Sequence, residues 1–258
     1  MTVYFIGAGP GDPELITLKG LRYLQQCPVV LYAGSLIPET ILESASENAE
    51  IINTAPLHLD QIIGHIQQAH QLGHDVARLH SGDPSIYGAT GEQMRRLDTL
   101  QIPYEIIPGV TAASASAAAL KCELTLPTIS QTIIYTRYAG KTDMPEGEDL
   151  TSLAQHKATL AIHLGITRIH KIVAELVPIY GEECPVCVCY RTSWPDEQII
   201  KGTLATITQQ VRAAKISRTA LILVGGVLDP QQFTDSYLYD VEKANIYRPR
   251  RQSSITRQ

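Results

Sequence analysis

The residues most able to do chemistry lie in short turns that follow apolar runs of the sequence. Asp83 stands in the turn Gly82-Asp83-Pro84, shortly after the apolar run 76–79, and His80 lies between that run and the turn. Open α/β sheets bind ligands at the carboxyl ends of their strands, so this position predicts a catalytic or binding role for Asp83. His80 could accept a proton at the same edge. Plainer interpretations stay open, because Asp before Pro often forms a turn and a partly buried histidine is often structural.

The sequence offers few other signatures of a reaction type. It shows no plausible Ser-His-Asp set, no cluster of metal ligands and no phosphate-binding loop with a lysine. Cys184 and Cys187 have the spacing of redox and zinc sites, but no second such pair and no histidine pair completes a four-ligand site. The segment 184–190 instead resembles a buried strand, in which cysteine packs as a small hydrophobic residue. We therefore expect no protein-bound metal and chemistry that depends on positioning the reactants.

The glycine-rich loop Gly7-Ala-Gly9-Pro-Gly11-Asp12 invites a dinucleotide-binding interpretation, which two features oppose. The third glycine of that fingerprint would fall at Asp12, where a carboxylate would face a pyrophosphate. The next predicted strand also ends in Ala33-Gly34, without an acidic residue for a ribose hydroxyl. A tight strand-to-helix turn explains the glycines as well. The loop by itself therefore does not predict a nicotinamide oxidoreductase.

Composition limits the class of protein further. The chain has 258 residues, of which 44% are hydrophobic and 18% are charged, as expected for a globular protein with a large core. Its formal net charge of −5 argues against a general nucleic-acid binder. No apolar run approaches the roughly 20 residues that span a bilayer, and the sequence begins without a basic leader. These features predict a soluble, cytoplasmic protein that acts on neither nucleic acid nor membrane.

Strands and helices alternate along the chain, which indicates an α/β fold with a mainly parallel sheet in the first half. The predicted strands are 3–6, 28–32, 76–79, 104–107, 133–137, 159–164, 186–191 and 220–225. A helix is expected to begin at Asp12-Pro13-Glu14, with Leu15, Leu18, Leu21 and Leu24 as its buried stripe. Further helices are expected around 62–73 and at 112–120, 149–156, 168–176 and 203–214. We predict two α/β domains, 1–121 and 122–247, followed by a flexible tail, 248–258.

Three motifs, taken together, resemble the class III tetrapyrrole methylases. They are Gly7-Ala-Gly-Pro-Gly-Asp-Pro13, His80-Ser-Gly-Asp-Pro-Ser-Ile-Tyr-Gly88 and Pro108-Gly-Val-Thr-Ala-Ala113. Other segments are similar to the precorrin-4 C11-methyltransferase branch of this family, and they are Tyr32–Leu36, Ser130–Thr132, Thr136-Arg137, Gly140–Thr142, Met144-Pro145 and Tyr190–Glu197. Asp143 and Thr128 depart from the pattern expected for that branch. The resemblance extends over about residues 1–230.

The resemblance implies two α/β domains with S-adenosylmethionine in the cleft between them, and a homodimer. It implies a methyl transfer to C11 of precorrin-4 or its cobalt form; another precorrin methylase with a different target carbon is the alternative. The implied cofactor-binding residues are Pro10, Gly82, Asp83, Ile86, Thr111, Ala112, Leu164, Thr192, Ala220 and Leu221. Asp83 and His80 are the catalytic candidates.

The substrate implied by the resemblance carries many carboxylates, which arginine holds well through paired hydrogen bonds. Arg137, Lys141 and Arg191 lie in the branch-specific segments and are the predicted clamps. Tyr87 is expected to pack against the macrocycle. Each of the three cations could instead be a solvated surface charge. An RNA or protein methylase of the same family, and a tetrapyrrole carrier without activity, are further alternatives.

Overall fold

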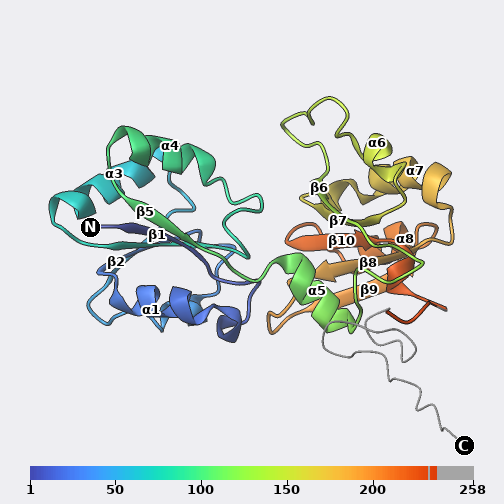
Figure 1. Cartoon of the computed structure of the whole chain (residues 1–258), viewed down its shortest axis with the longest axis horizontal. Helices are drawn as coiled ribbons and strands as arrows, with labels where there is room; N and C mark the ends of the chain where they lie inside the picture. The colour runs from blue at the N-terminus through green and yellow to red at the C-terminus, as the bar shows by residue number, and fades with distance from the viewer. Residues whose placement is uncertain (232, 237–258) are drawn as a thin grey trace, which may run out of the picture.

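The computed structural model describes residues 1–231 and 233–236. In this part of the chain two sheets form two lobes that lie side by side and meet near helix α5, Ala112–Leu120 (Figure 1). The predicted tail 248–258 and the end of the predicted second domain lie outside the described residues. None of the described helices is long and apolar enough to cross a membrane.

The N-terminal lobe, formed by the elements from β1 to β5, is built on a parallel sheet with strand order β3-β2-β4-β1-β5. Its strands are β1 (Val3–Gly7), β2 (Val29–Tyr32), β3 (Glu50–Asn53), β4 (Val76–His80) and β5 (Tyr104–Ile107). Its helices are η1 (Pro13–Leu15), α1 (Leu18–Gln26), α2 (Glu39–Leu42), α3 (Leu59–Gln71) and α4 (Gly91–Thr99). Helices α3 and α4 cover one face around Phe5, and α1 and α2 cover the other around Ile6.

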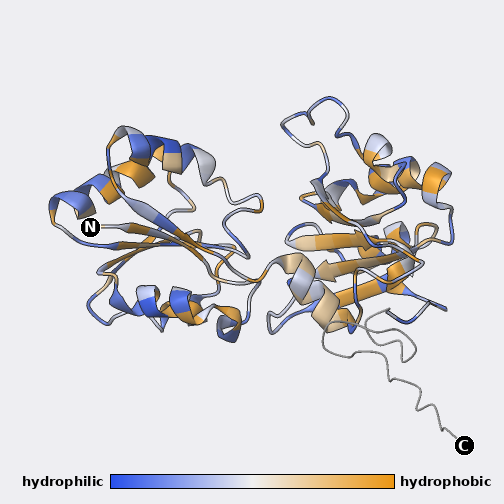
Figure 2. Ribbon diagram, in the orientation of Figure 1, coloured by the Kyte–Doolittle hydropathy of each residue, from blue (hydrophilic) through white to orange (hydrophobic). Residues whose placement is uncertain are grey.

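The C-terminal lobe, formed by α5 and the elements after it, has a mixed sheet with strand order β6-β7-β10-β8-β9. Only the β6–β7 pair of this sheet is parallel. Its strands are β6 (Ile133–Arg137), β7 (Thr159–His163), β8 (Pro185–Tyr190), β9 (Gln198–Thr203) and β10 (Ala220–Val224). The remaining elements are α6 (Leu150–Ala154), η2 (Ile166–Arg168), α7 (Ile169–Tyr180), α8 (Ile207–Ala213) and η3 (Gly226–Leu228). Figure 2 shows the apolar strands at the centre of both lobes.

The predicted strands are present to within about two residues at each end, while two further strands were not predicted. Both missed strands, β3 and β9, are sheet edges, and their side chains are mostly exposed or half-buried. Helix α4 was missed for a similar reason, because only Gln93 and Leu97 of its nine residues are buried. Elements that bury few apolar side chains give a weak periodic signal in the sequence.

The helix predicted to begin at Asp12 is two elements, and the prediction of its buried stripe is wrong at Leu18. Asp12 caps only the short helix η1, where its side chain accepts from the N–H of Glu14 at 2.9 Å. The backbone is extended at Ile16, and α1 begins anew with Thr17 as its N-cap. Within α1, Leu18 is 88% exposed while Leu24 is buried, because residues six positions apart lie on different faces of an α-helix.

Helix α5 packs on the C-terminal sheet. Ala113 of this helix is fully buried in one apolar cluster with Leu221 and Leu223 of β10. Leu126 belongs to the same cluster, so the chain on both sides of Lys121 lies against one sheet. We therefore propose that the boundary between the domains lies in the loop 108–111 and not at 121/122.

Candidate active site

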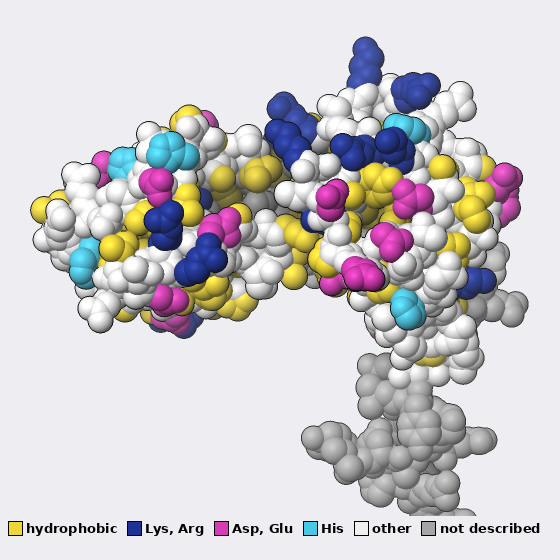
Figure 3. Space-filling view, turned by 90° about the horizontal axis from the view of Figure 1, so that it is seen from above, with side chains coloured by type: hydrophobic (Ala, Val, Ile, Leu, Met, Phe, Trp, Pro, Cys, Tyr) yellow, Lys and Arg dark blue, Asp and Glu magenta, His cyan; other side chains and the backbone are white. Residues whose placement is uncertain are grey.

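A cavity of about 370 Å³ lies between the two lobes. Figure 3 shows hydrophobic side chains in the hollow between the lobes and Lys and Arg side chains gathered beside it on the C-terminal lobe. Lining residues from the N-terminal lobe and the junction include Pro10, Leu36, Ser81, Gly82, Asp83, Ile86, Tyr87, Thr111 and Ala112. Those from the C-terminal lobe include His163, Leu164, Ile166, Thr167, Cys189, Arg191, Thr192 and the run 217–221. Every predicted cofactor-binding residue lines this cavity.

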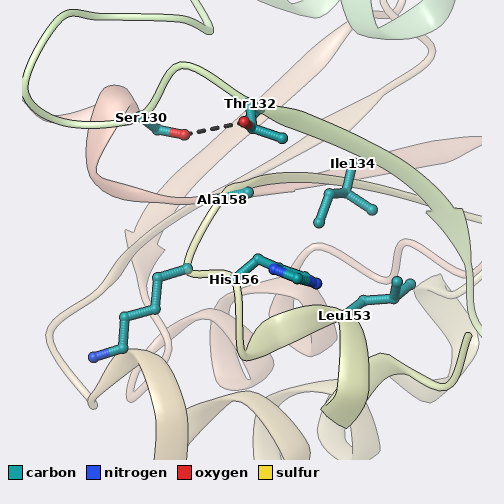
Figure 4. Close-up of a pocket in the computed structure, with 7 residues that line it drawn as sticks. Ser130, Thr132, Ile134, Leu153, His156 and Ala158 are labelled. Carbon is teal, nitrogen blue, oxygen red and sulfur yellow. Dashed lines mark hydrogen bonds between the residues drawn. The ribbon is translucent and has the colours of Figure 1, made fainter. Parts of the chain in front are cut away.

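A second hollow, of about 470 Å³, lies on the C-terminal lobe beside β6 and α6 (Figure 4). It is lined by Ser130, Thr132, Ile134, Leu153, His156, Lys157 and Ala158. None of the predicted site residues lines it, and its Ser130 hydroxyl already donates to the carbonyl of Thr132 at 3.0 Å. The cavity between the lobes is therefore the candidate active site.

Backbone forms much of the N-terminal wall, because three loops meet where strands β1, β4 and β5 end. Gly82 and Gly9 exchange hydrogen bonds, with N···O distances of 2.7 and 3.3 Å. A Cβ on Gly109 would lie 2.1 Å from the carbonyl oxygen of Gly82, and a Cβ on Gly7 would lie 2.6 Å from Gly109 Cα. Only glycine permits this approach at positions 7 and 109, whereas Gly82 has φ +65°, a backbone conformation that favours glycine for a different reason.

Asp83 ties two of these loops together. Its Oδ1 accepts from the N–H of Ser85 at 2.8 Å and from the Ser85 hydroxyl, and its Oδ2 accepts from the N–H of Gly109 at 2.8 Å. Burial raises the pKa of Asp83, but the hydrogen bonds from Ser85 and Gly109 outweigh it and hold the pKa below its ordinary value. The carboxylate is thus ionised at neutral pH and bound to the chain itself, which fits a positioning role. Its catalytic role stays a prediction.

Arg78 of β4 supports the loop that carries Ile86 and Tyr87 through a chain of hydrogen bonds. The buried Arg78 side chain donates to Gln93 Oε1 at 3.2 Å and to Thr54 Oγ1 at 2.9 Å. Gln93 in turn donates to the carbonyl of Ala89 at 2.8 Å. Burial lowers the pKa of Arg78 to about 10. This chain of hydrogen bonds holds the loop in a conformation with positive φ at Tyr87 and Ala89.

The two histidines near the cavity differ in access. His80 is 6% exposed and does not line the cavity; burial, reinforced by Arg78, lowers its pKa to about 3. His163, which sequence reasoning missed, does line the cavity, and burial lowers its pKa to about 4. Its ring lies 5.2 Å from that of Tyr87, and its buried Nε2 has no hydrogen-bond partner in the described part of the chain. The role of His80 as proton acceptor stays a prediction, and His163 is better placed for it.

The predicted residues of the C-terminal lobe reach the cavity from three strand ends. Leu164, after β7, has φ +55° and is 71% exposed, so its side chain stands open beside the cavity. Thr192, after β8, is buried and shares a hydrogen bond of 3.1 Å with the hydroxyl of Ser116 on α5. Ala220 and Leu221 begin β10. His163 is the last residue of β7, directly before Leu164, and this place at a strand end is the one signal that could have pointed to it.

The three predicted carboxylate clamps lie in different surroundings. Arg137 donates to the carbonyls of Thr142 and Asp143 at 3.1 and 2.7 Å, close to the cavity residue Tyr87 but outside the lining. Lys141 is exposed on the same loop and does not line the cavity. Arg191 lines the cavity, but its guanidinium lies over the ring of Trp194 in its own lobe. Their roles in binding substrate stay predictions.

The cysteines of β8 are packed into the sheet. Cys187 and Cys189 are buried, and burial raises the pKa of their thiols to about 11 and about 12. Cys184 is half-buried, with a pKa that burial raises to about 11. Within the described residues no three His, Cys, Asp or Glu side chains come together as a metal site.

Comparison with known proteins agrees with this geometry. Residues 2–208 match the family model described as tetrapyrrole (corrin/porphyrin) methylases. The chain is 60% identical to a precorrin-4 C(11)-methyltransferase of Pseudomonas aeruginosa, over 96% of this chain and 99% of that protein. It is 50% identical to a cobalt-precorrin-4 C(11)-methyltransferase of Methanocaldococcus jannaschii, over 95% of each.

Solved structures give the same picture. A cobalt precorrin-4 methyltransferase superposes with a TM-score of 0.87 at 44% identity, over 89% of this chain and 96% of that one. A uroporphyrin-III C-methyltransferase from Thermus thermophilus, complexed with S-adenosylhomocysteine, gives a TM-score of 0.74 at 29% identity, over 89% of this chain and 94% of that one. The α/β architecture predicted from the sequence, with two lobes and a cavity between them, is confirmed.

Proposed function

The chain belongs to the tetrapyrrole (corrin/porphyrin) methylase family, and we propose that it transfers a methyl group from S-adenosylmethionine to C11 of precorrin-4 or cobalt-precorrin-4 in cobalamin biosynthesis. The observation that carries the proposal is the 60% identity to a precorrin-4 C(11)-methyltransferase over 96% of this chain. Relatives of the metal-free and the cobalt type cover the chain almost equally, so either form of the ring is a substrate to test.

The cavity between the lobes fits S-adenosylmethionine. Its N-terminal wall is largely backbone, and a Cβ on Gly82 would meet nothing nearer than 3.8 Å, so the surface beside this glycine is open to a ligand. The buried, unpartnered Nε2 of His163 adds a polar group that a ligand could satisfy. We propose that Pro10, Gly82, Ile86, Thr111 and Ala112 hold the cofactor from one side, and Leu164, Thr192, Ala220 and Leu221 from the other.

The sulfonium methyl group is itself strongly electrophilic, so the cofactor supplies the reactive group. The protein has to align the accepting carbon and exclude water, and such positioning can supply roughly 7–11 kcal/mol. Asp83 contributes by tying the loops of β4 and β5, which carry Gly82 and Thr111. Arg78 contributes by supporting the loop of Ile86 and Tyr87. These residues act through the shape of the cavity wall.

A proton released from the ring after methylation needs an acceptor. His163 lines the cavity between Tyr87 and Tyr135, with ring centroids 5.2 and 6.2 Å away. Its lowered pKa keeps it neutral at physiological pH, so it can take up a proton, although its low basicity makes it a weak acceptor. We propose His163 in preference to His80, which lies outside the lining.

The carboxylates of the ring need cations near the mouth of the cavity. Figure 3 shows Lys and Arg side chains gathered on the C-terminal lobe beside the hollow between the lobes. Arg137 is our first candidate, because it lies near Tyr87 and none of the ion pairs among the described residues includes it. Lys141 extends from the loop that Arg137 holds.

The first test is calorimetric titration with S-adenosylhomocysteine, with NADH as control. We expect saturable binding of the first compound alone. Incubation with S-adenosylmethionine bearing a labelled methyl group, and with metal-free or cobalt-bound precorrin-4, should then place the label on C11 by NMR. Binding of NADH alone would refute the cofactor class, and a label on another carbon would refute the C11 assignment but not the family.

Assembly and location belong to the same proposal. We propose a cytoplasmic homodimer, on the basis of the family resemblance. Light scattering coupled to gel filtration should give twice the mass of the chain, and a monomer would refute the dimer.

A further inference from the structure

One loop of the C-terminal lobe crosses to the N-terminal lobe at the edge of the cavity. The indole N–H of Trp194 donates to the carbonyl of Pro10 at 2.8 Å, and the N–H of Asp12 donates to the hydroxyl of Ser193 at 2.9 Å. The two bonds join positions 184 and 181 residues apart in the sequence. We call these two hydrogen bonds the Trp194 latch.

The glycine loop is shaped to receive the indole ring. Gly11 is buried, and a Cβ on it would lie 2.1 Å from Cδ1 of Trp194. Any other residue at position 11 would therefore displace the ring. This close approach accounts for the glycine at position 11 without a bound pyrophosphate.

The ring is also held by residues of its own lobe. The guanidinium of Arg191 lies 4.0 Å above the Trp194 ring, and its Nε is 2.9 Å from Asp196 Oδ1. The carboxylate of Glu197 accepts from the N–H of Ser193 at 2.7 Å. A cation over an indole face is a favourable contact, so the ring is held by Arg191 as well as by its approach to Gly11.

The latch joins two walls of the same cavity. Pro10 lines the cavity from the N-terminal lobe, and Arg191 and Thr192 line it from the C-terminal lobe, directly before Ser193. We propose that Trp194 and Ser193 are positioning residues that hold the glycine loop against the C-terminal lobe and so preform the cofactor cavity. The proposal deepens the proposed function and rests on it for the identity of the ligand. Under this proposal Arg191 also positions the Trp194 ring, in addition to its predicted contact with substrate carboxylates.

The physical consequence is a shift in population. Without the latch the lobes can separate, and the cofactor binds only the fraction of molecules with a formed cavity. The apparent dissociation constant rises by the inverse of that fraction. The rate at saturation changes less, because the bound ligand restores the closed arrangement.

The first experiment compares two variants that each lose one hydrogen bond to a carbonyl. Trp194→Phe keeps an aromatic ring but removes the donor to Pro10. Tyr180→Phe is the matched control, because the Tyr180 hydroxyl donates to the Ala158 carbonyl at 2.6 Å within the C-terminal lobe. We expect the dissociation constant of S-adenosylhomocysteine to rise about fivefold to tenfold in Trp194→Phe, the size of one lost hydrogen bond, and less than about twofold in Tyr180→Phe.

The second experiment needs no ligand, because Trp194 is the only tryptophan of the chain. Its fluorescence reports the latch directly in the protein, and Ser193→Ala removes the second hydrogen bond while keeping the fluorophore. We expect acrylamide to quench Trp194 more strongly in Ser193→Ala than in the parent protein. Ser193 has φ +68°, which a β-branched threonine tolerates poorly, so the control is Ser152→Ala, which removes a hydroxyl bonded to Asp149 Oδ2 at 2.6 Å. It should leave the parent quenching unchanged.

The outcomes are distinguishable. Equal quenching in the parent protein and Ser193→Ala, together with equal affinities in Trp194→Phe and Tyr180→Phe, would overturn the latch. If the parent protein binds no S-adenosylhomocysteine, the proposed function fails, and the quenching comparison still decides the latch. If Trp194→Phe does not fold, Ser193→Ala supplies both the affinity and the quenching result.

Discussion

Replacing Asp83 by Asn tests how the cavity wall is held. The carboxylate accepts from Ser85 on one oxygen and from the N–H of Gly109 on the other. An asparagine side chain has only one oxygen, so in the Asp83→Asn variant the amide nitrogen must face one of these donors. The variant therefore loses a charge-assisted hydrogen bond to one of the two oxygens. Ser85 bonds to Asp83 through both its N–H and its hydroxyl, whereas the loop 108–111 has only the bond from Gly109, so this loop is the more sensitive one.

The expected magnitude follows from the type of bond and its exposure. A hydrogen bond to a charged group contributes about 1.5–3 kcal/mol. Asp83 and Gly109 are only part-buried, so water replaces some of the loss and we expect about 1.5–2 kcal/mol, at the lower end of that range. This corresponds to roughly a 10- to 30-fold weaker affinity for S-adenosylhomocysteine, because the loop carries Thr111 of the cavity wall.

The assay is calorimetric titration with S-adenosylhomocysteine, together with urea unfolding of the same samples. Asp149→Asn is the control, because Asp149 also accepts from a serine N–H and hydroxyl, at 2.9 and 2.6 Å from Ser152, but caps α6 outside the cavity. It should lose stability without losing affinity. An affinity of Asp83→Asn within twofold of the parent protein would refute the reasoning and leave Asp83 as a turn-former only.

The effect of Asp83 also has a predictable pH dependence. Because the folded-state pKa lies below the ordinary 3.8, the carboxylate adds stability that is present above pH 3.8 and is lost as the pH falls through the folded-state pKa. The difference in stability between the parent protein and Asp83→Asn should therefore be constant near neutral pH and narrow below pH 3.8. A difference that grows on acidification would contradict the direction of this shift.

Three further predictions concern other groups of the cavity and the core. Arg137→Ala should raise KM for the tetrapyrrole while leaving the affinity for S-adenosylhomocysteine unchanged in titrations; an equal effect on both would reject a substrate clamp. The pKa values of His80 and His163 fall from 6.5 to about 3 and about 4 on folding, so the unfolded chain binds more protons and the free energy of unfolding should drop as the pH falls from about 6.5 towards 4. Urea unfolding at both pH values checks this. The free energy of unfolding of a His163→Gln variant should fall less steeply with pH, and a free energy of unfolding that does not change with pH would contradict the prediction. Replacing Cys184 and Cys187 by Ser should leave activity intact and independent of added zinc or chelator, and metal-linked unfolding of the parent protein would disprove their packing role.

Much of the fold follows from local patterns in the sequence. Most of the predicted strands are buried apolar runs, because a strand that fills a core needs such a run, and all of them lie close to the predicted positions. The edge strands β3 and β9 escaped prediction, since their side chains bury little. The start of α1 also escaped prediction, because the break at Ile16 and the cap at Thr17 do not follow from the leucine spacing.

The residues that we propose to bind the cofactor could be chosen from the sequence for a different reason. They lie in short motifs at strand ends, where the local sequence already determines a tight turn, and the resemblance of those motifs to one family supplied their ligand. Every one of them lines the cavity between the lobes. His163 was missed because a single histidine at a strand end carries no motif.

The sequence by itself determined the family, the turns that line the cavity and most of the strands, because each of these depends on residues that are neighbours along the chain. Features that depend on contacts between distant segments were decided only by the tertiary structure. It placed α5 on the C-terminal sheet, buried His80 outside the cavity lining, and set Trp194 against Gly11 across the lobes. The physical reason is that burial and hydrogen bonding between distant segments set the pKa, the access and the partner of a side chain, and none of these is written in its local sequence.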